Sequence, residues 1–168
     1  EVLDKYSPGQ DEFIEQLRKL APEAIVVVAF GQKLSCEVLN LPDKGCVNLH
    51  ASLLPKYRGA SPIHKAIIDG ETETGVTIMF MDEGWDTGDI ITKKRVQIYN
   101  TDTVGILHDK LAVIGAKLLS ETMTDIEANN IKPVKQDDNK ATYAYKLNKD
   151  VGEIDWNNSA VDIYNLVR

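Results

Sequence analysis

Asn48 and His50 are the residues whose types and spacing first suggest chemistry. They stand two positions apart at the end of a short apolar run, in the stretch VNLHASLLPKYRG of residues 47–59. Because successive side chains of a strand point to opposite faces, both polar groups face the same way. A histidine can exchange a proton near neutral pH, and an asparagine amide can donate to an oxygen that gains negative charge. The pair therefore predicts acid–base chemistry, with satisfaction of backbone groups at a strand end as the alternative.

An acidic turn, DEGWDTGD at residues 82–89, is the second candidate for chemistry. It holds four acidic residues, two glycines and a tryptophan. A carboxylate beside His50 would orient the imidazole and stabilise its protonated form. Asp86 could fill this role, and Asp82, Glu83 and Asp89 compete for it. The alternative is a solvated hairpin loop. The turn lacks the alternating ligands of a calcium loop, so we expect no metal.

The basic turn PKYRG places Lys56 and Arg58 on either side of Tyr57. Such a turn could contact a phosphate or a negatively charged substrate, or it could simply be an exposed loop. The other two histidines, His64 and His108, fall within helix patterns, and we expect no catalytic role for them.

Composition limits the class of protein. A chain of 168 residues with 43% hydrophobic and 27% charged residues is typical of one globular domain. The net charge of −7 and pI near 5.0 argue against a nucleic-acid grip within this chain alone. If the chain meets RNA, most of the affinity should come from elsewhere.

Cysteine content and apolar runs indicate the compartment. Cys36 and Cys46 lack a second pair or a histidine-rich neighbourhood, so we expect buried thiols in a reducing cytoplasm. The longest apolar run, residues 24–30, is too short to cross a bilayer. We therefore expect a cytoplasmic protein without membrane contact.

The periodicity of apolar residues predicts the elements that must position these side chains. A buried interior parallel strand is expected over 24–30, and Asn48 and His50 would end a second strand. Open parallel sheets bind ligands beyond the carboxyl ends of their strands, where both residues would lie. We predict an α/β fold with a mostly parallel sheet flanked by helices. The expected helices cover 11–21, 63–70, 103–130 and a start near 160, and the expected strands cover 24–30, 45–50, 74–81 and 88–98.

Residues 47–90 carry a joint pattern of motifs. Asn-x-His, SLLP followed by YRG, ETGVT and the DxGDI-type turn occur in this order. In this pattern the chain resembles the folate-dependent formyltransferases, in particular those that act on methionyl-tRNA. The stretches IVVVAFGQKL, LHDKL, ATYAYKL and IDW extend the similarity over nearly the whole chain, whereas the first ten residues fit poorly.

The resemblance implies a Rossmann-like formyltransferase domain in which Asn48, His50 and Asp86 form the catalytic trio. The donor would be 10-formyltetrahydrofolate, the acceptor the amino group of methionine on initiator tRNA, and no metal would be needed. Lys56 and Arg58 would contact the acceptor. By the same resemblance the folate site would comprise Phe30, Gly31, Gln32, Leu34, Ser52, Leu53, Leu54, Pro55, Asp82, Glu83, Gly84 and Trp85.

The resemblance also implies a division of the chain. Residues 1–158 would form the catalytic domain with an incomplete N-terminus, and residues 159–168 would begin a linker toward an absent C-terminal β-barrel domain. Without a first strand the sheet would expose an edge, so we expect this piece to be unstable alone. We expect a monomer.

Three rival functions remain open. A sugar-nucleotide N-formyltransferase would share the trio and the folate but act on an amino sugar. A formyltetrahydrofolate hydrolase would use water in place of the amine. A non-catalytic folate- or RNA-binding module would keep only the fold.

Overall fold

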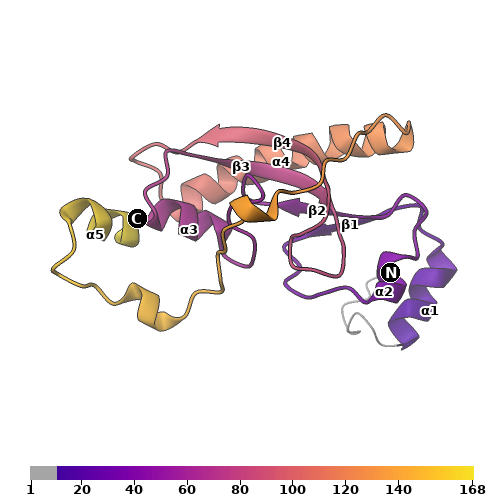
Figure 1. The fold of residues 1–168 in the computed structure, drawn as a ribbon, viewed down its shortest axis with the longest axis horizontal. Coiled ribbons are helices and arrows are strands. Elements are labelled where there is room, and N and C mark those ends of the chain that lie inside the picture. Colours follow the sequence, from indigo (N-terminus) through magenta and orange to yellow (C-terminus); the bar gives the residue numbers. More distant parts are fainter. Residues whose placement is uncertain (1–10) are drawn as a thin grey trace.

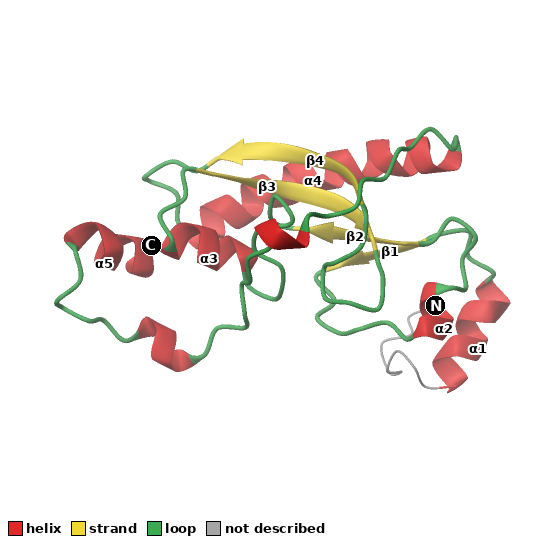
Figure 2. Cartoon of the chain, in the orientation of Figure 1, coloured by secondary structure: helices red, strands yellow, loops and turns green. Residues whose placement is uncertain are grey.

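The computed structural model describes residues 11–168, and the first ten residues, which fit the motif pattern poorly, lie outside them. One four-stranded sheet in the order β1-β2-β3-β4 forms its centre (Figures 1 and 2). Its strands are β1 (Ile25–Val28), β2 (Cys46–His50), β3 (Glu73–Phe80) and β4 (Ile90–Gln97). The helices are α1 (Asp11–Leu20), α2 (Cys36–Leu39), α3 (Pro62–Ile68), α4 (Val104–Glu127) and α5 (Ala160–Val167), with short 3₁₀ turns η1 (Asp138–Lys140) and η2 (Lys149–Gly152). The predicted helices and strands are confirmed, apart from shifts at their ends.

The α/β fold class is confirmed, but the expectation of a mostly parallel sheet is wrong. β1 and β2 are parallel, whereas β2–β3 and β3–β4 are antiparallel. The short acidic turn between β3 and β4 allows only an antiparallel pairing, because parallel strands need a long crossover. The expectation of an interior strand at β1 is also wrong for the described sheet. β1 lies at its edge, with Val26 43% and Val28 52% exposed.

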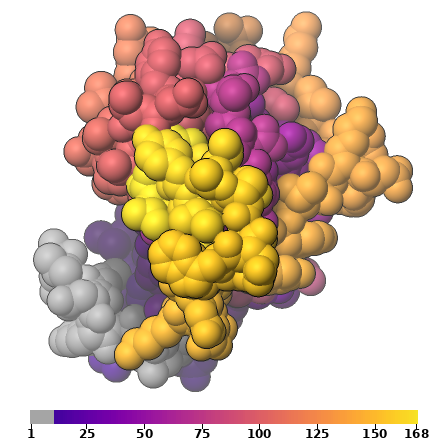
Figure 3. All heavy atoms as spheres, turned by 90° about the vertical axis from the view of Figure 1, so that its left-hand side faces the viewer, coloured from indigo at the N-terminus to yellow at the C-terminus, as the bar shows by residue number. Residues whose placement is uncertain are grey.

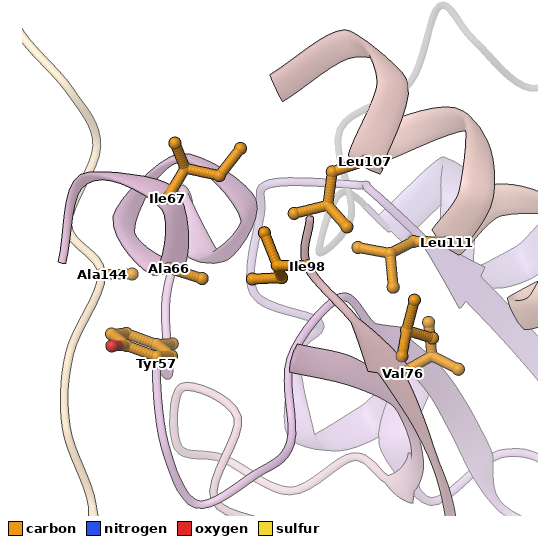
Figure 4. Packing of buried hydrophobic residues seen from close by; sticks show 9 residues of the cluster. Tyr57, Ala66, Ile67, Val76, Ile98, Leu107, Leu111 and Ala144 are labelled. Carbon is orange, nitrogen blue, oxygen red and sulfur yellow. The ribbon is translucent and has the colours of Figure 1, made fainter. Parts of the chain in front are cut away.

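The long helix α4 covers one face of the sheet (Figure 1). Thr103 caps it by accepting a hydrogen bond from the Ile106 backbone N–H. A Cβ at Gly115 would approach Leu49 Cδ1 to 2.9 Å, so the glycine permits close packing of helix on sheet. Figure 4 shows the main cluster of buried residues, which joins β3 to α4 and α3. Its buried members are Tyr57, Ala66, Ile67, Val76, Val96, Ile98, Leu107, Leu111 and Ala144.

The opposite face of the sheet carries Asn48 and His50. Asn48 pairs with Met79 and His50 with Thr77, while Val47 and Leu49 pack toward α4. The predicted alternation of β2 is thus confirmed. The Thr77 hydroxyl donates to the Ser52 carbonyl and accepts from the Leu54 N–H, which fixes the loop after β2 against this face.

The end of the chain is anchored to the start of α4. α5 packs beside α3 (Figure 3), and Arg168 Nη1 donates to the Asp102 carbonyl at 2.9 Å. The buried Asp102 carboxylate accepts from Lys110 Nζ at 2.6 and 2.8 Å and from the Tyr99 N–H at 2.9 Å. Burial by itself would raise the pKa of Asp102. The hydrogen bonds from Lys110 and Tyr99, with the nearby positive charges, outweigh that effect and hold the pKa below its ordinary value.

The two cysteines differ in environment. Cys46 is buried as predicted, and burial raises its thiol pKa to about 11. The prediction of burial is wrong for Cys36, because this residue is exposed at the start of α2 and its Sγ lies 3.3 Å from Glu83 Oε1. Across residues 11–168 we find neither a helix with the length and apolarity to cross a bilayer nor a cluster of three metal-ligating side chains.

We predict that Asp102→Asn lowers the free energy of unfolding by about 2 kcal/mol at pH 7, because the Lys110 ammonium loses its charged acceptor. Since the pKa of Asp102 is depressed on folding, this stabilisation is complete above the ordinary carboxyl pKa, about 3.9, and is lost as the pH falls through the folded value. Urea unfolding at several pH values should therefore show the gap between wild type and variant closing in acid. A gap that stays constant down to acid unfolding would contradict this role.

Candidate active site

A pocket of about 450 Å³ opens at the carboxyl ends of β1 and β2. Asn48 and His50 line it from β2, and residues 27–34 line it from β1 and the turn that follows. The other walls come from residues 59–64, which include the start of α3, and from β3, the acidic turn and the first half of α4. The predicted location at the strand ends is confirmed.

The Asp86 carboxylate joins the segments of this site. Its Oδ1 lies 3.5 Å from His50 Nδ1 and 3.4 Å from Asn48 Nδ2, and its Oδ2 accepts from the Gly59 N–H at 2.8 Å. The first two distances exceed those of a strong hydrogen bond, so the Gly59 contact is the firmest of the three. Asp86 has a φ of 54°, in the left-handed region that non-glycine residues rarely adopt.

The backbone carbonyl of Tyr57 holds the other edge of the His50 ring. His50 Nε2 lies 2.8 Å from this oxygen, and the ring is buried. Both ring nitrogens therefore lie near oxygen atoms that can accept a hydrogen bond, and these contacts fix the plane of the ring. Tyr57 is itself fixed, because its hydroxyl lies 2.9 Å from Glu71 Oε1 and 3.1 Å from Asp69 Oδ2. Burial, together with these carboxylates, raises the pKa of Tyr57 far above its ordinary value.

Gly59 allows the chain to present its N–H to Asp86. Its φ is +110°, and a Cβ there would lie 2.8 Å from the Ala144 carbonyl oxygen. Both the conformation and the close approach require glycine. The glycine of the YRG motif is thus required for the hydrogen bond to Asp86.

Gln136 and Arg58 form a buried clamp behind Asp86. Gln136 Nε2 donates to the carbonyls of Asp86 at 2.9 Å and Gly88 at 2.8 Å. Its Oε1 accepts from Arg58 Nε at 3.1 Å and Nη2 at 2.9 Å, and Arg58 Nη2 also pairs with Asp138 at 2.8 Å. The expectation that Arg58 offers an exposed contact is wrong, because its side chain is 3% exposed. Lys56 is 55% exposed, pairs with Glu71 and does not line the pocket.

The predicted folate residues divide into two groups. Phe30, Gly31, Gln32, Leu34, Asp82, Gly84 and Trp85 line the pocket. Glu83 lies just outside its lining, where its carbonyl accepts from Lys33 Nζ at 2.6 Å.

The SLLP motif does not reach the pocket. Ser52 and Leu54 are buried, and Leu54 packs with Met79 and Ile90 beneath the sheet. Leu53 and Pro55, with Leu54, line a separate cavity. Residues 52–55 thus lie outside the lining of this pocket, because the turn carries them away from the strand end, and their place in the folate site stays a prediction.

The other acidic residues of the turn have different partners. Asp82 Oδ1 accepts from the Gly84 N–H and the Thr87 hydroxyl, and Asp89 is exposed. Sequence reasoning missed Gln136, Gly59 and the Tyr57 carbonyl. The only local signal for Gln136 was its place in the QD segment before ATYAYKL. His64 and His108 line the pocket without contacting Asp86.

The sequence matches the family described as Formyl transferase over residues 3–123. The chain belongs to this family. A curated relative, methionyl-tRNA formyltransferase from Halothermothrix orenii, is 62% identical over 99% of this chain and 53% of its own length. The chain thus spans about half the length of the curated relatives it matches.

Solved formyltransferase structures have the same fold. An N-formyltransferase from Helicobacter canadensis, solved in complex with folinic acid and dTDP-3-aminofucose, is 30% identical, with a TM-score of 0.68 over 73% of this chain and 46% of that one. A 4-N formyltransferase from Francisella tularensis is 22% identical, with a TM-score of 0.83 over 97% of this chain and 66% of that one. The shared fold includes the strands and turns that hold Asn48, His50 and Asp86.

We predict that Gln136→Leu lowers turnover at least tenfold and costs about 2 kcal/mol of folding free energy. The change leaves the Asp86 and Gly88 carbonyls without their Gln136 donor, and the buried Arg58 guanidinium keeps Asp138 but loses its Gln136 acceptor. The check is steady-state turnover with urea unfolding of the same samples. Gln97→Leu, at a residue of the exposed edge strand β4, is the matched control and should change both little. Equal effects of the two changes would refute the clamp.

Proposed function

We propose that the full-length protein transfers a formyl group from 10-formyltetrahydrofolate to the amino group of methionine on initiator tRNA. The observation that carries the proposal is the convergence of Asn48, His50 and Asp86 in the lining of one pocket. The 62% identity to a protein named methionyl-tRNA formyltransferase supports this acceptor.

The pocket suits the donor in size and character. A volume of about 450 Å³ is in the range of small-molecule sites. Phe30, Leu34 and Trp85 offer apolar surface for a flat ring, and Lys33 Nζ lies 5.6 Å from the Trp85 ring centre. We propose that these residues and the acidic turn hold the folate, which supplies the formyl group when bound.

The protein groups then have distinct roles. Attack by an amine places negative charge on the formyl oxygen, and the Asn48 amide can donate to that charge. His50 takes up the proton that the amine loses and returns it to the folate nitrogen as the bond from that nitrogen to the formyl carbon breaks, so that tetrahydrofolate leaves. Asp86 keeps the His50 ring in orientation and balances its positive charge, while Gly59 and Gln136 keep Asp86 in place.

A sugar-nucleotide N-formyltransferase is the second candidate, because solved structures of such enzymes share this fold. Their identities of 30% and 27% are well below that of the methionyl-tRNA relatives. We therefore favour the tRNA acceptor. We also propose that residues 1–158 form the catalytic domain, that residues 159–168 lead toward a further domain, and that the protein acts as a monomer in the cytoplasm.

The acceptor is tested with the full-length protein and 10-formyltetrahydrofolate. One reaction receives methionyl initiator tRNA and the other a 4-amino-sugar nucleotide, and folate release is followed in both. We expect release with the tRNA alone. Folate release with the sugar nucleotide alone would overturn the proposal that the acceptor is methionyl-tRNA. Release in neither reaction would favour a non-catalytic binding module.

We predict that His50→Ala lowers turnover by about 10²–10⁴-fold, the usual contribution of a positioned acid or base. Asn48→Ala should lower it by about 10²–10³-fold, as for loss of one oxyanion donor. Folate affinity, measured by titration calorimetry, should change far less than turnover in both. His108→Ala, at an exposed histidine on the pocket wall, should have a much smaller effect on turnover. Near-normal turnover of His50→Ala would remove it from the mechanism.

A further inference from the structure

Two exposed tyrosines stand side by side on the segment after η1. Tyr143 is 50% and Tyr145 is 77% exposed, and their rings stack with centroids 5.9 Å apart and planes 9° apart. Ala144 between them is 1% exposed and lies against the core beside Tyr57 and Ala66 (Figure 4). The inward Ala144 therefore turns both rings outward, and we name Tyr143 and Tyr145 the tyrosine platform.

The platform lies close to the rim of the active-site pocket. The Ala144 N–H donates to the Arg58 carbonyl at 2.7 Å, and the Ala144 carbonyl accepts from the Ser61 N–H at 3.0 Å. Ser61 and Gly59 both line the pocket. A polymer that rests on the platform therefore contacts the segment that is hydrogen-bonded to the loop that presents Gly59 to Asp86.

A second cavity lies at the other end of the same segment. Its volume is about 620 Å³, and residues 139–142, just before the platform, line it. Four cationic residues also line it, Lys56, Lys93, Arg95 and Lys140, against two acidic residues, Glu71 and Glu73. We name it the basic cavity.

The charge of the basic cavity is only partly balanced. Lys56 pairs with Glu71, Arg95 with Glu73, and Lys140 with Asp137. Lys93 Nζ donates to the neutral Leu54 carbonyl at 2.9 Å, which leaves its charge uncancelled by that bond. Lys93 thus gives the cavity a positive charge that none of these three ion pairs balances.

We propose, on the basis of the proposed function, that the platform and the basic cavity bind the single-stranded 3′ end of the acceptor tRNA. Unpaired bases stack on exposed aromatic rings, and their phosphates seek clustered Lys and Arg. Tyr145 offers an open ring face, and the basic cavity offers a phosphate site on the same segment. Together they lead the aminoacylated end toward the pocket that holds Asn48 and His50.

The combination of rings and cations favours RNA over a protein partner. Protein interfaces are depleted of lysine in their cores, whereas single-strand sites combine stacking rings with a positive groove. A protein partner would depend on the rings but only weakly on salt. An RNA strand depends on both.

The experiment uses the full-length protein and a fluorescent RNA of sequence 5′-ACCA. Tyr143→Ala and Tyr145→Ala should each weaken binding about tenfold, within the range for loss of one base–aromatic stack. Tyr145→Phe should bind like wild type, because the ring remains. Trp156→Ala removes an equally exposed ring away from the stack and should also bind like wild type. Lys93→Gln should weaken binding and reduce the salt slope by about one.

Formylation kinetics provide the second readout. The double variant Tyr143→Ala/Tyr145→Ala should raise KM for methionyl-tRNA while kcat and folate affinity stay near wild type. Unchanged RNA binding in the double variant, an equal loss in Trp156→Ala, or no RNA binding by wild type would each overturn the platform. Failure of the proposed function gives a different result, since wild type would then form no formylated tRNA while the oligonucleotide titrations still report on the tyrosines.

Discussion

The position of one carboxylate, that of Asp86, organises the active-site region. Its side chain contacts β2 through Asn48 and His50 and the loop after it through Gly59, while its backbone carbonyl is held by Gln136. A left-handed φ at an aspartate is unfavourable in isolation. It persists because hydrogen bonds from segments far apart in sequence converge on this single residue. The strain is therefore localised at the residue that we propose as the carboxylate partner of His50.

Local sequence patterns predicted much of this arrangement. The alternation of β2 placed Asn48 and His50 on one face, and the 3.6-residue period predicted the long helix that forms α4. These predictions succeeded because each depends on residues within one element. The choice of Asp86 among four acids of one turn came from the resemblance to the formyltransferase family, and the structure brings Asp86 and His50 together.

The misplaced features all depend on contacts between distant segments. Nothing local in PKYRG reveals that Arg58 turns inward, since its acceptors Gln136 and Asp138 lie about 80 residues later. The apolar residues of SLLP were expected to contact folate, but the same residue types also pack in a core, and Leu54 packs against Met79 and Ile90. The apolar run of β1 also indicates burial without saying what covers it. Composition identifies which side chains avoid water and leaves their partners undetermined.

The net charge of the whole chain is also a poor guide to the charge at one binding site. A value of −7 over the chain suggests repulsion of nucleic acid, yet exposed charges are screened beyond about 8 Å at physiological ionic strength. A phosphate therefore responds to the groups of one cavity and hardly to the total. Lys56, Lys93, Arg95 and Lys140 come from three separate stretches of chain and meet only in the fold. An acidic protein can thus present a cationic cavity where folding brings such residues together. In this chain residues 139–142 line that cavity, and Ala144, two residues later, is hydrogen-bonded to Arg58 and Ser61 on either side of Gly59.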